Sequence, residues 1–426
     1  MFKKILALTL SVLMLATLCV SFASCGKKRL GEGEEILPRK AITSEVTLPD
    51  DFKIGLITLH DENSTYDKNF IDAFKQVCEA MGLVANTSYF IVSNIDESEA
   101  CYNTAKDLAQ NKGCKVIFAD SFGHEDYMKQ AAQEFPDVQF CHATGVSSKQ
   151  SNIANFHNAF AAIYEGRYIA GIVAGMKLNE MIADGKITAD KAVMGYVGAF
   201  TYAEVVSGLT SFYLGAKSVC PSVTMKVRFT GSWYDQALEQ EAANSLINTD
   251  KCVLISQHAD SLGAPTACQQ AKVPNVSYNG STYSAGKDTW LVSSAINWAP
   301  YFQYIIEKTA KGEAFDTDWT GTIATNSVVL SGLNLDVIAE GTEAKVQEAL
   351  DGFKAGTLHV FDTNTFTVKG EKLTSYAADI DGDYAPDEGV NVIVNGYFDE
   401  SNATTFRSAP YFDLEIDGIS FLNTKY

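Results

Sequence analysis

Apolar and polar positions alternate in a regular rhythm from Phe52 onward. The run 52–59 has the apolar continuity of a buried strand. It is followed by apolar residues at helical spacing from Phe70 to Met81, where Gly82 is placed to end the helix. The same pattern predicts further strands and helices in turn: strands at 88–92, 115–119 and 138–142, and helices at 100–110 and 125–135. This alternation indicates a parallel sheet covered by helices on both faces.

A long helix is expected next, over 159–178, and its glycines at 166, 171 and 175 suggest close packing against a neighbour. The alternation then restarts, which predicts a second lobe similar to the first. Its expected elements are strands at 192–200, 224–230, 252–257, 276–278 and 289–293, and helices at 204–218, 234–246 and 266–271. A helix at 301–311 and a strand-rich tail that is hard to place complete the chain.

These elements divide the chain into an α/β protein of two lobes. We expect a first lobe from residues 51–165 and 298–330, a second lobe from 166–297, and a C-terminal extension over 331–426. Hinge crossovers are expected near Gly166 and near Asn297.

The N-terminus has the order of a secretory signal. Lys3 and Lys4 precede an apolar run over 5–22, and small residues lead to Cys25. The boundary resembles a bacterial lipobox, with Phe22 in place of the usual Leu. We therefore expect residues 1–25 to be a lipoprotein signal peptide, Cys25 to carry a lipid that holds the protein on the outer face of the cell membrane, and 26–50 to be a flexible tether. The alternative is an ordinary signal peptide with a coincidental cysteine.

Charge and cysteine spacing exclude several classes of function. The formal net charge of −19 argues against nucleic acid or an anionic membrane surface as a direct partner. Seven cysteines follow the leader without a C-x-x-C pair, so we expect small buried thiols and no metal or cofactor. One acidic stretch, 379–387, partly resembles a calcium loop, but its glycine falls at the wrong position and an exposed acidic turn is favoured.

Polar and aromatic residues follow the predicted strands. Ligands of open parallel sheets bind at the carboxyl ends of strands, and aromatic faces with a few amides and carboxylates suit a flat heteroaromatic ligand. Alternatives remain for some candidates: Trp233 and Trp298 as core residues, Asp120 as a helix cap, and His258 as a structural histidine. The candidate ligand-binding residues are Tyr66, Asp120, Ser121, Phe122, Phe200, Trp233, Tyr234, Asp260, Asn279, Asn297 and Trp298.

Several of these positions lie in motifs that resemble one family. They include Ser121-Phe122-Gly123, the segment 232–235, the segment 257–261 and Asn297-Trp298. The sequence over roughly 50–330 resembles the basic membrane protein family of ABC-transporter substrate-binding lipoproteins, which bind purines and purine nucleosides. The resemblance implies a two-lobed type I periplasmic binding protein fold and a purine base or nucleoside bound between the lobes. It also implies an ABC permease with its ATPase as partner, and we expect a monomer.

The first loop departs from the family pattern. Asp61, Thr65 and Tyr66 match it, but Ser64 stands where Trp is usual. The nucleoside-binding branch often has a Lys near Asn297, and its absence here favours a free base. No nucleophile elbow, P-loop or H-E-x-x-H motif occurs, so we expect no catalysis. The alternatives are a ligand sensor that signals to a membrane partner and an extracytoplasmic hydrolase on the same fold.

Overall fold

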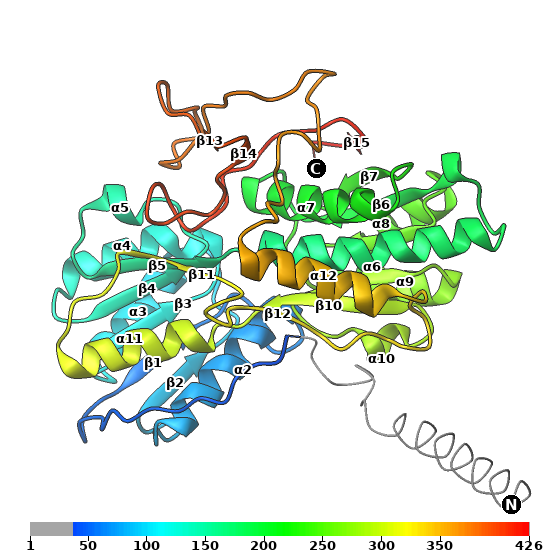
Figure 1. Ribbon diagram of the computed structural model, residues 1–426. Helices are drawn as coiled ribbons and strands as arrows, with labels where there is room; N and C mark the ends of the chain where they lie inside the picture. Colours follow the sequence, from blue (N-terminus) through cyan, green and yellow to red (C-terminus); the bar gives the residue numbers. More distant parts are fainter. Residues whose placement is uncertain (1–36, 426) are drawn as a thin grey trace, which may run out of the picture.

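The computed structural model describes residues 37–425, which form two α/β lobes and an extension that lies across both (Figure 1). The first lobe is built on a six-stranded sheet of order β11-β5-β4-β3-β1-β2, in which every neighbouring pair is parallel. Its strands are β1 (Ile54–Ile57), β2 (Tyr89–Val92), β3 (Val116–Ala119), β4 (Gln139–Ala143), β5 (Phe156–Ala161) and β11 (Asp318–Gly321). Its helices are α2 (Thr65–Ala80), α3 (Glu99–Gln110), α4 (Glu125–Glu134), α5 (Ser148–Ser151), α11 (Ala299–Lys311) and the short 3-10 turn η1 (Phe122–His124).

The second lobe is built on a seven-stranded sheet of order β12-β10-β9-β8-β6-β7-β15, parallel except for β12. Its strands are β6 (Val193–Gly198), β7 (Thr224–Phe229), β8 (Leu254–Gln257), β9 (Asn275–Tyr278), β10 (Trp290–Ile296), β12 (Val328–Leu330) and β15 (Ile419–Phe421). Its helices are α6 (Ile163–Ala183), α7 (Ala203–Val219), α8 (Gln236–Asn248), α9 (Gly263–Ala271), α10 (Tyr283–Gly286), α12 (Thr342–Ala355) and the 3-10 turn η2 (Ala189–Lys191). The predicted two-lobed α/β fold is confirmed.

The chain crosses between the lobes three times before the extension. It leaves the first sheet between β5 and α6, returns between β10 and α11, and crosses again between β11 and β12. The third crossing is a difference from expectation, because residues up to 330 were assigned to the first lobe. Val328–Leu330 instead pairs antiparallel with β10, and this edge of the second sheet offers it backbone partners.

The helix expected over 159–178 is wrong at its start. Residues 156–161 form β5, which lies between β4 and β11, and the helix begins only at Ile163. All six residues of β5 are buried, including the polar His157 and Asn158, and the strand is next to the edge strand β11. A short buried run of this kind cannot be separated from a buried helix by periodicity alone.

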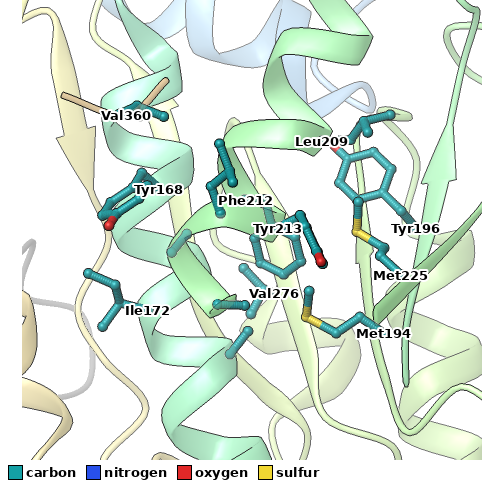
Figure 2. Packing of buried hydrophobic residues seen from close by; sticks show 14 of the residues in the cluster. Tyr168, Ile172, Met194, Tyr196, Leu209, Phe212, Tyr213, Met225, Val276 and Val360 are labelled. Atoms are coloured by element: carbon teal, nitrogen blue, oxygen red, sulfur yellow. The ribbon is translucent and has the colours of Figure 1, made fainter. Parts of the chain in front are cut away.

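Glycines in α6 and α7 allow the two helices to pack backbone to backbone. A Cβ on Gly171 would lie 2.0 Å from the carbonyl oxygen of Phe212, and one on Gly215 would lie 1.9 Å from that of Tyr168. These distances confirm the close packing that the glycines predicted. Figure 2 shows the surrounding core, in which Phe212 and Tyr213 of α7 lie among residues of α6 and of the second sheet.

The segment 37–50 differs from the flexible tether that the sequence predicts for it. The Lys40 N–H donates to the side-chain oxygen of Asn326 (2.8 Å), and the same side chain donates to the Pro38 carbonyl (2.9 Å). Ile42 and Leu48 pack against the first lobe. The segment contains two prolines and four charged residues, but hydrogen bonds to Asn326 and two apolar anchors fix its path. Residues 26–36 lie outside the described part of the chain.

The extension was expected to be strand-rich, and this expectation is wrong. After α12 it is mostly irregular, with one hairpin of β13 (Ile393–Val394) and β14 (Tyr397–Phe398) before β15. Its backbone is held by side chains instead: the Glu400 carboxylate accepts from the N–H groups of Ser401, Tyr411 and Phe412. Phe361 and Phe412 stack with ring centroids 4.4 Å apart in the core of the second lobe.

The extension is attached to both lobes (Figure 1, orange to red). On the first lobe, the Ser408 N–H donates to Asp318 (2.7 Å) and Asn158 donates to the Ser408 hydroxyl (3.1 Å). On the second lobe, β15 extends the sheet in parallel beside β7. The extension therefore bridges the lobes on one side of the cleft between them.

Two further observations concern the cysteines and the helices of residues 37–425. All seven cysteines from Cys78 to Cys268 are buried and free, which confirms the predicted small buried thiols. No helix in this range has the length and apolar character that crossing a membrane requires. The leader and Cys25 lie outside it.

Candidate functional site

A cavity lies between the two lobes, at the carboxyl ends of strands from both sheets. The space between its side chains, counted with its mouth, is about 390 Å³. The cavity is lined by Leu59, His60, Tyr66, Asp67, Asp120, Ser121, Phe122 and Thr144 of the first lobe and by Glu204, Trp233, His258, Asp260, Tyr278 and Asn279 of the second.

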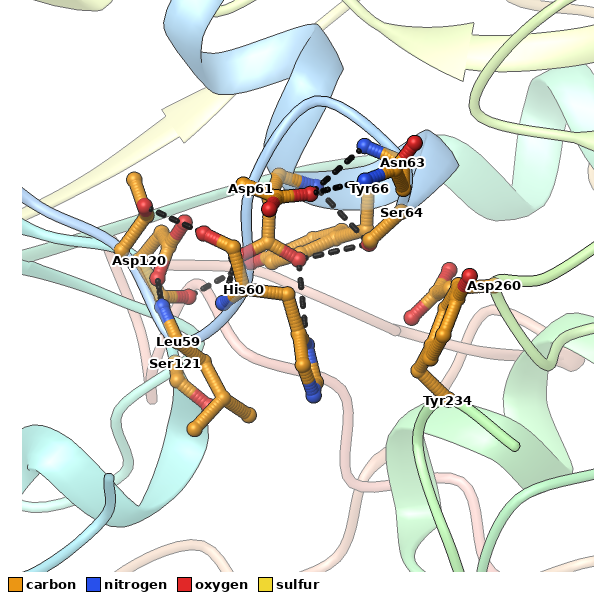
Figure 3. A network of polar contacts seen from close by, with 12 residues as sticks. Leu59, His60, Asp61, Asn63, Ser64, Tyr66, Asp120, Ser121, Tyr234 and Asp260 are labelled. Carbon is orange, nitrogen blue, oxygen red and sulfur yellow. Dashed lines mark hydrogen bonds and ion pairs between the residues drawn. The ribbon is translucent and has the colours of Figure 1, made fainter. Parts of the chain in front are cut away.

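Three contacts across the cleft hold the lobes in a closed arrangement. The backbone N–H and the hydroxyl of Thr65 both donate to the Asp260 carbonyl, at 3.0 and 3.1 Å. The ring of Phe122 stacks on Tyr202 with centroids 5.2 Å apart. His60 lies against Tyr234, with centroids 5.4 Å apart, and Figure 3 shows the loop that carries His60 facing Tyr234 and Asp260.

The loop after β1 is fixed by a buried carboxylate. Ser64 caps α2 and exchanges hydrogen bonds with Asp67: its oxygen accepts from the Asp67 N–H (3.2 Å), and its hydroxyl donates to the carboxylate (2.6 Å). The same carboxylate accepts from the His60 N–H (2.7 Å). Burial would raise the pKa of Asp67, but the hydrogen bonds from His60 and Ser64 outweigh it and lower the pKa. Asp67 is therefore the ionised carboxylate of the site, placed in the first turn of a helix.

Asp120 is a second buried carboxyl group, and its pKa shifts in the opposite direction to that of Asp67. One oxygen accepts from the Leu59 N–H (3.1 Å), and its backbone carbonyl accepts from the Tyr66 hydroxyl (2.7 Å). The other carboxyl oxygen is buried without a hydrogen-bond partner among the described residues. Burial, and then the neighbouring Asp67, raise the pKa of Asp120 well above its usual value. This carboxyl group favours the protonated form.

The second lobe presents a similar carboxyl group. Asp260 is buried, and the Asn279 amide donates to it at 3.4 Å. Burial raises its pKa well above the usual range, and the charges of Asp67, Glu239 and Glu204 add to the effect. Two carboxyl groups that favour the protonated form, Asp120 and Asp260, therefore face one cavity from opposite lobes. Each can donate one hydrogen bond and accept another.

Glu204 and His258 form a linked pair beside Asp260. Glu204 lies in the first turn of α7, and its carboxylate is 3.5 Å from His258 Nε2. Burial lowers the pKa of His258, although the nearby Glu204 opposes this. The His258 ring lies 4.9 Å from that of Tyr278, whose other neighbour is the buried Arg167 guanidinium, at 4.9 Å. Arg167 thus places a buried positive charge against Tyr278, behind the carboxyl groups of Glu204 and Asp260.

Several buried polar atoms of the cavity lining have no hydrogen-bond partner among the described residues. In native proteins such atoms are rare and need an explanation. Two of the residues also have left-handed backbone conformations, Thr144 with φ 69° and Asn279 with φ 62°, and for the β-branched Thr this is a strained state. The atoms are Asp120 Oδ2, Thr144 Oγ1, His258 Nδ1, the Tyr278 hydroxyl and Asn279 Oδ1. Their convergence from both lobes fits a polar ligand.

The structure brings most of the predicted site residues together. Seven of them line the cavity: Tyr66, Asp120, Ser121, Phe122, Trp233, Asp260 and Asn279. The Ser121 hydroxyl is already used, because it donates to Glu97 at 2.6 Å. Asp120 caps no helix, since the following turn η1 begins with Ser121 at its cap position.

The other four predicted residues do not line the cavity. Phe200 packs edge-on against Trp233, with centroids 4.8 Å apart, and Tyr234 lies beside His60. The Asn297 amide donates to the Asn326 carbonyl (2.9 Å) at the crossover between the lobes. Trp298 is 1% exposed and stacks on Phe70 at 4.1 Å, so it belongs to the core of the first lobe.

Seven lining residues were not among the predicted ones. Asp67 and Glu204 lie in the first turn of the helix after a strand. His258 was interpreted as structural, and the structure gives it a cavity-facing ring as well as its Glu204 contact. The complete set is Leu59, His60, Asp67, Thr144, Glu204, His258 and Tyr278. Six of them follow strands, whereas Tyr278 is the last residue of β9, so the strand-end rule extended by one helical turn would have found all but Tyr278.

The acidic turn 379–387 lies in the extension. Carboxylate oxygens of Asp379, Asp381 and Asp387 lie within 4.8 Å of one another. The turn uses them itself, since Asp379 accepts from the Gly382 and Tyr384 N–H groups and Asp387 accepts from the Ile380 N–H.

Comparison with known proteins identifies the family of the chain. The sequence model of the Bmp family, described as "ABC transporter substrate-binding protein PnrA-like", matches residues 55–353. A purine-binding protein of Brucella abortus is 30% identical over 331 residues, which cover 75% of this chain and 88% of that protein. A putative ABC transporter glucose-binding protein of Haloferax volcanii is 30% identical over 275 residues, or 63% of this chain and 66% of that protein.

A solved structure shows the same fold. An ABC transporter solute-binding protein from Conexibacter woesei superposes with a TM-score of 0.58 at 20% identity and covers 72% of this chain and 98% of its own. The family is one of substrate-binding proteins and not of enzymes. The chain belongs to the Bmp family of PnrA-like ABC transporter substrate-binding proteins.

Proposed function

We propose that the protein binds a purine base or purine nucleoside between its lobes and delivers it to an ABC permease. The observation that carries this proposal is the combination of aromatic rings and neutral-leaning carboxyl groups in one narrow cavity. Phe122, Trp233 and Tyr278 supply ring faces from both lobes, and Asp120 and Asp260 supply carboxyl groups. The Brucella abortus relative, named as purine-binding, supports the same ligand class.

The carboxyl groups suit the edge of a purine. A protonated carboxyl group donates through its hydroxyl and accepts through its carbonyl oxygen, and purine edges offer adjacent ring nitrogens and N–H groups. Asp120 has one oxygen that accepts from the Leu59 N–H. Its other oxygen, when protonated, can donate either to Asp67 or to a ligand, so a ligand competes with Asp67 for this hydrogen bond.

Closure of the lobes is the mechanism of capture. The contacts of Thr65 with Asp260 and of Phe122 with Tyr202 join residues of different lobes, and the chain between the lobes consists of crossover segments. Hinge closure around a ligand is a common use of such crossovers. Opening would break these contacts and expose the carboxyl groups, and a bound purine would favour the closed form.

We also propose that a lipid on Cys25 holds the protein at the outer face of the cell membrane. The support is the order of the leader: two lysines, an apolar run and a small-residue boundary before the cysteine. A substrate-binding protein that works with a permease gains from an anchor, because tethering raises its effective concentration at the transporter.

The ligand class is tested by isothermal titration calorimetry with adenine, guanine, hypoxanthine, adenosine, guanosine and glucose. At least one purine compound should bind, and Trp233→Ala should weaken it by about 1–3 kcal/mol, since that is the usual contribution of base–aromatic stacking. Trp319→Ala is the matched control: Trp319 stacks on Tyr301 in the first lobe, away from the cavity, and its loss should leave affinity unchanged. Binding of glucose alone, or of none of these compounds, would contradict the proposal.

Binding should be accompanied by proton uptake. In the open form, Asp120 and Asp260 face water and have the ordinary pKa of a carboxyl group, about 3.9, whereas in the closed form burial raises both pKa values well above it. Affinity for adenine should therefore be highest at low pH and fall as pH rises through the neutral range, by up to about tenfold per pH unit for each group.

Calorimetry in buffers of different ionisation enthalpy measures this uptake directly. Asp120→Asn keeps an oxygen for the Leu59 N–H and cannot titrate, so it should reduce the number of protons taken up. Affinity that rises with pH, or a binding enthalpy that is the same in every buffer, would show that the carboxyl groups stay ionised on closure.

The anchor is tested by Cys25→Ala. The variant should appear in the medium or the soluble extracytoplasmic fraction, because a cysteine thiol is needed to carry the lipid, while purine affinity stays unchanged. Immunoblots of membrane and soluble fractions measure the distribution. A variant that remains with the membrane as fully as the parent protein would refute the lipid assignment.

A further inference from the structure

A second cavity adjoins the ligand cavity and is formed partly by the extension; we call it the extension chamber. The space between its side chains, counted with its mouth, is about 1050 Å³, compared with about 390 Å³ for the ligand cavity. Phe122, Thr144 and Glu204 line both cavities. The other side of the chamber is formed by extension residues between 379 and 413, among them Asp379, Tyr384, Arg407 and Asp413.

The two cavities meet at an aromatic pair. Phe122 of the first lobe lines both, and Tyr202 of the second lobe, which stacks on it at 5.2 Å, lines only the extension chamber. A ring held against Phe122 in the ligand cavity would have the chamber on the far side of this pair. The hydroxyl of Thr144, which is buried and has no hydrogen-bond partner among the described residues, lies at the same junction. The two cavities therefore adjoin each other at Phe122, Thr144 and Glu204, which line both.

Arg407 is the buried donor of the chamber. Its side chain is 6% exposed and is fixed by hydrogen bonds to the carbonyls of Ala409 (3.3 Å) and Pro410 (2.9 Å). Its remaining terminal nitrogen, Nη1, has no hydrogen-bond partner in residues 37–425 and lies 3.9 Å from the Asp379 carboxylate. A guanidinium nitrogen so fixed offers hydrogen bonds to an oxygen of a ligand.

The charges of the chamber limit what this oxygen can belong to. Glu204, Asp379 and Asp413 line the chamber together with Arg407, so carboxylates outnumber the guanidinium there. A phosphate would meet these like charges, which disfavours it. Hydroxyl groups suit the same lining, because they accept from Arg407 and Thr144 and donate to the carboxylates.

Tyr384 forms the outer lip of the chamber. It is 77% exposed, the most exposed of the large hydrophobic residues in the described chain, and its φ of 67° is a left-handed conformation that costs a tyrosine energy. An exposed aromatic ring on a strained backbone is unusual for a residue with only a structural role. Its position lets the ring cover a group that occupies the chamber.

The chamber exists because the extension is held on both lobes. Ser408 hydrogen-bonds Asp318 of the first lobe next to Arg407, and β15 joins the second sheet. We propose that the extension is part of the binding site, and that its chamber accepts a neutral, hydroxyl-rich substituent of the bound ring. The inference rests on the proposed purine function and adds to it the sugar of a nucleoside and the residues Tyr384, Thr144 and Arg407 that would contact it.

This inference and the missing lysine near Asn297 predict different ligands. The lysine's absence favours a free base, whereas the chamber supplies polar groups for a sugar from a different part of the chain. The two expectations are separated by comparing adenine with adenosine.

The experiment is calorimetry of the full chain with adenine, adenosine and adenosine 5′-monophosphate. The parent protein should bind adenosine more tightly than adenine and gain nothing further from the phosphate. Tyr384→Ala should weaken adenosine roughly three- to tenfold, the range expected for loss of one aromatic contact, and leave adenine within about twofold. Leu238→Ala is the control, because Leu238 is another exposed apolar residue, on α8, that lines neither cavity.

Arg407→Lys provides an independent variant, checked for folding by its melting temperature. It keeps the charge but loses the fixed fork of donors, and it should also weaken adenosine more than adenine. The inference is overturned if adenine binds as tightly as adenosine, or if Tyr384→Ala changes both affinities equally or neither. If the guanine compounds bind instead, the same comparison is made with guanine and guanosine. Failure of every purine base and nucleoside to bind the parent protein would overturn the purine function as well, so the two failures are distinct.

Discussion

Closure of the two lobes over a set of buried carboxyl groups is the constraint on which the rest of the structure depends. Asp67, Asp120 and Asp260 meet in one narrow cavity, and removing a carboxylate from water without a partner is expensive. The protein meets this cost in different ways. Asp67 is held ionised by Ser64 and His60, whereas burial favours the protonated form of Asp120 and Asp260. Several polar atoms of the lining have no partner among the described residues, and a complementary ligand would satisfy them.

The scaffold explains how such groups can be positioned from two directions. In each lobe the carboxyl ends of parallel strands point to the cleft, and the cavity residues lie in the loops and first helical turns that follow. The second lobe is made rigid by the backbone contact of α6 with α7 at Gly171 and Gly215. The N-terminal segment 37–50 and the C-terminal extension both run along the lobes and make contacts near their crossovers. The extension is bonded to both lobes, so its contacts would also have to change if the lobes move apart.

The sequence was most informative where a local pattern reports a local structure. Apolar runs and helical spacing predicted most strands and helices, and the strand-end rule predicted seven cavity residues, including Asp120 and Asp260. It failed where tertiary context decides. Trp298 follows a strand as Trp233 does, yet stacking on Phe70 places it in the core. The short buried run 156–161 fits either a strand or a helix, and only its pairing with β4 and β11 decides between the two. The extension folds through side-chain contacts such as those of Glu400, which leave no periodic pattern in the sequence.

The central claim is that a purine stabilises the closed arrangement of the lobes. Small-angle X-ray scattering of the protein, with and without saturating adenine or adenosine, tests it most directly, because hinge closure makes the particle more compact. The account predicts a smaller radius of gyration in the presence of ligand. It also predicts that the scattering curve of the liganded protein matches the one calculated from the closed structure. A radius of gyration that is the same with and without bound ligand would contradict it.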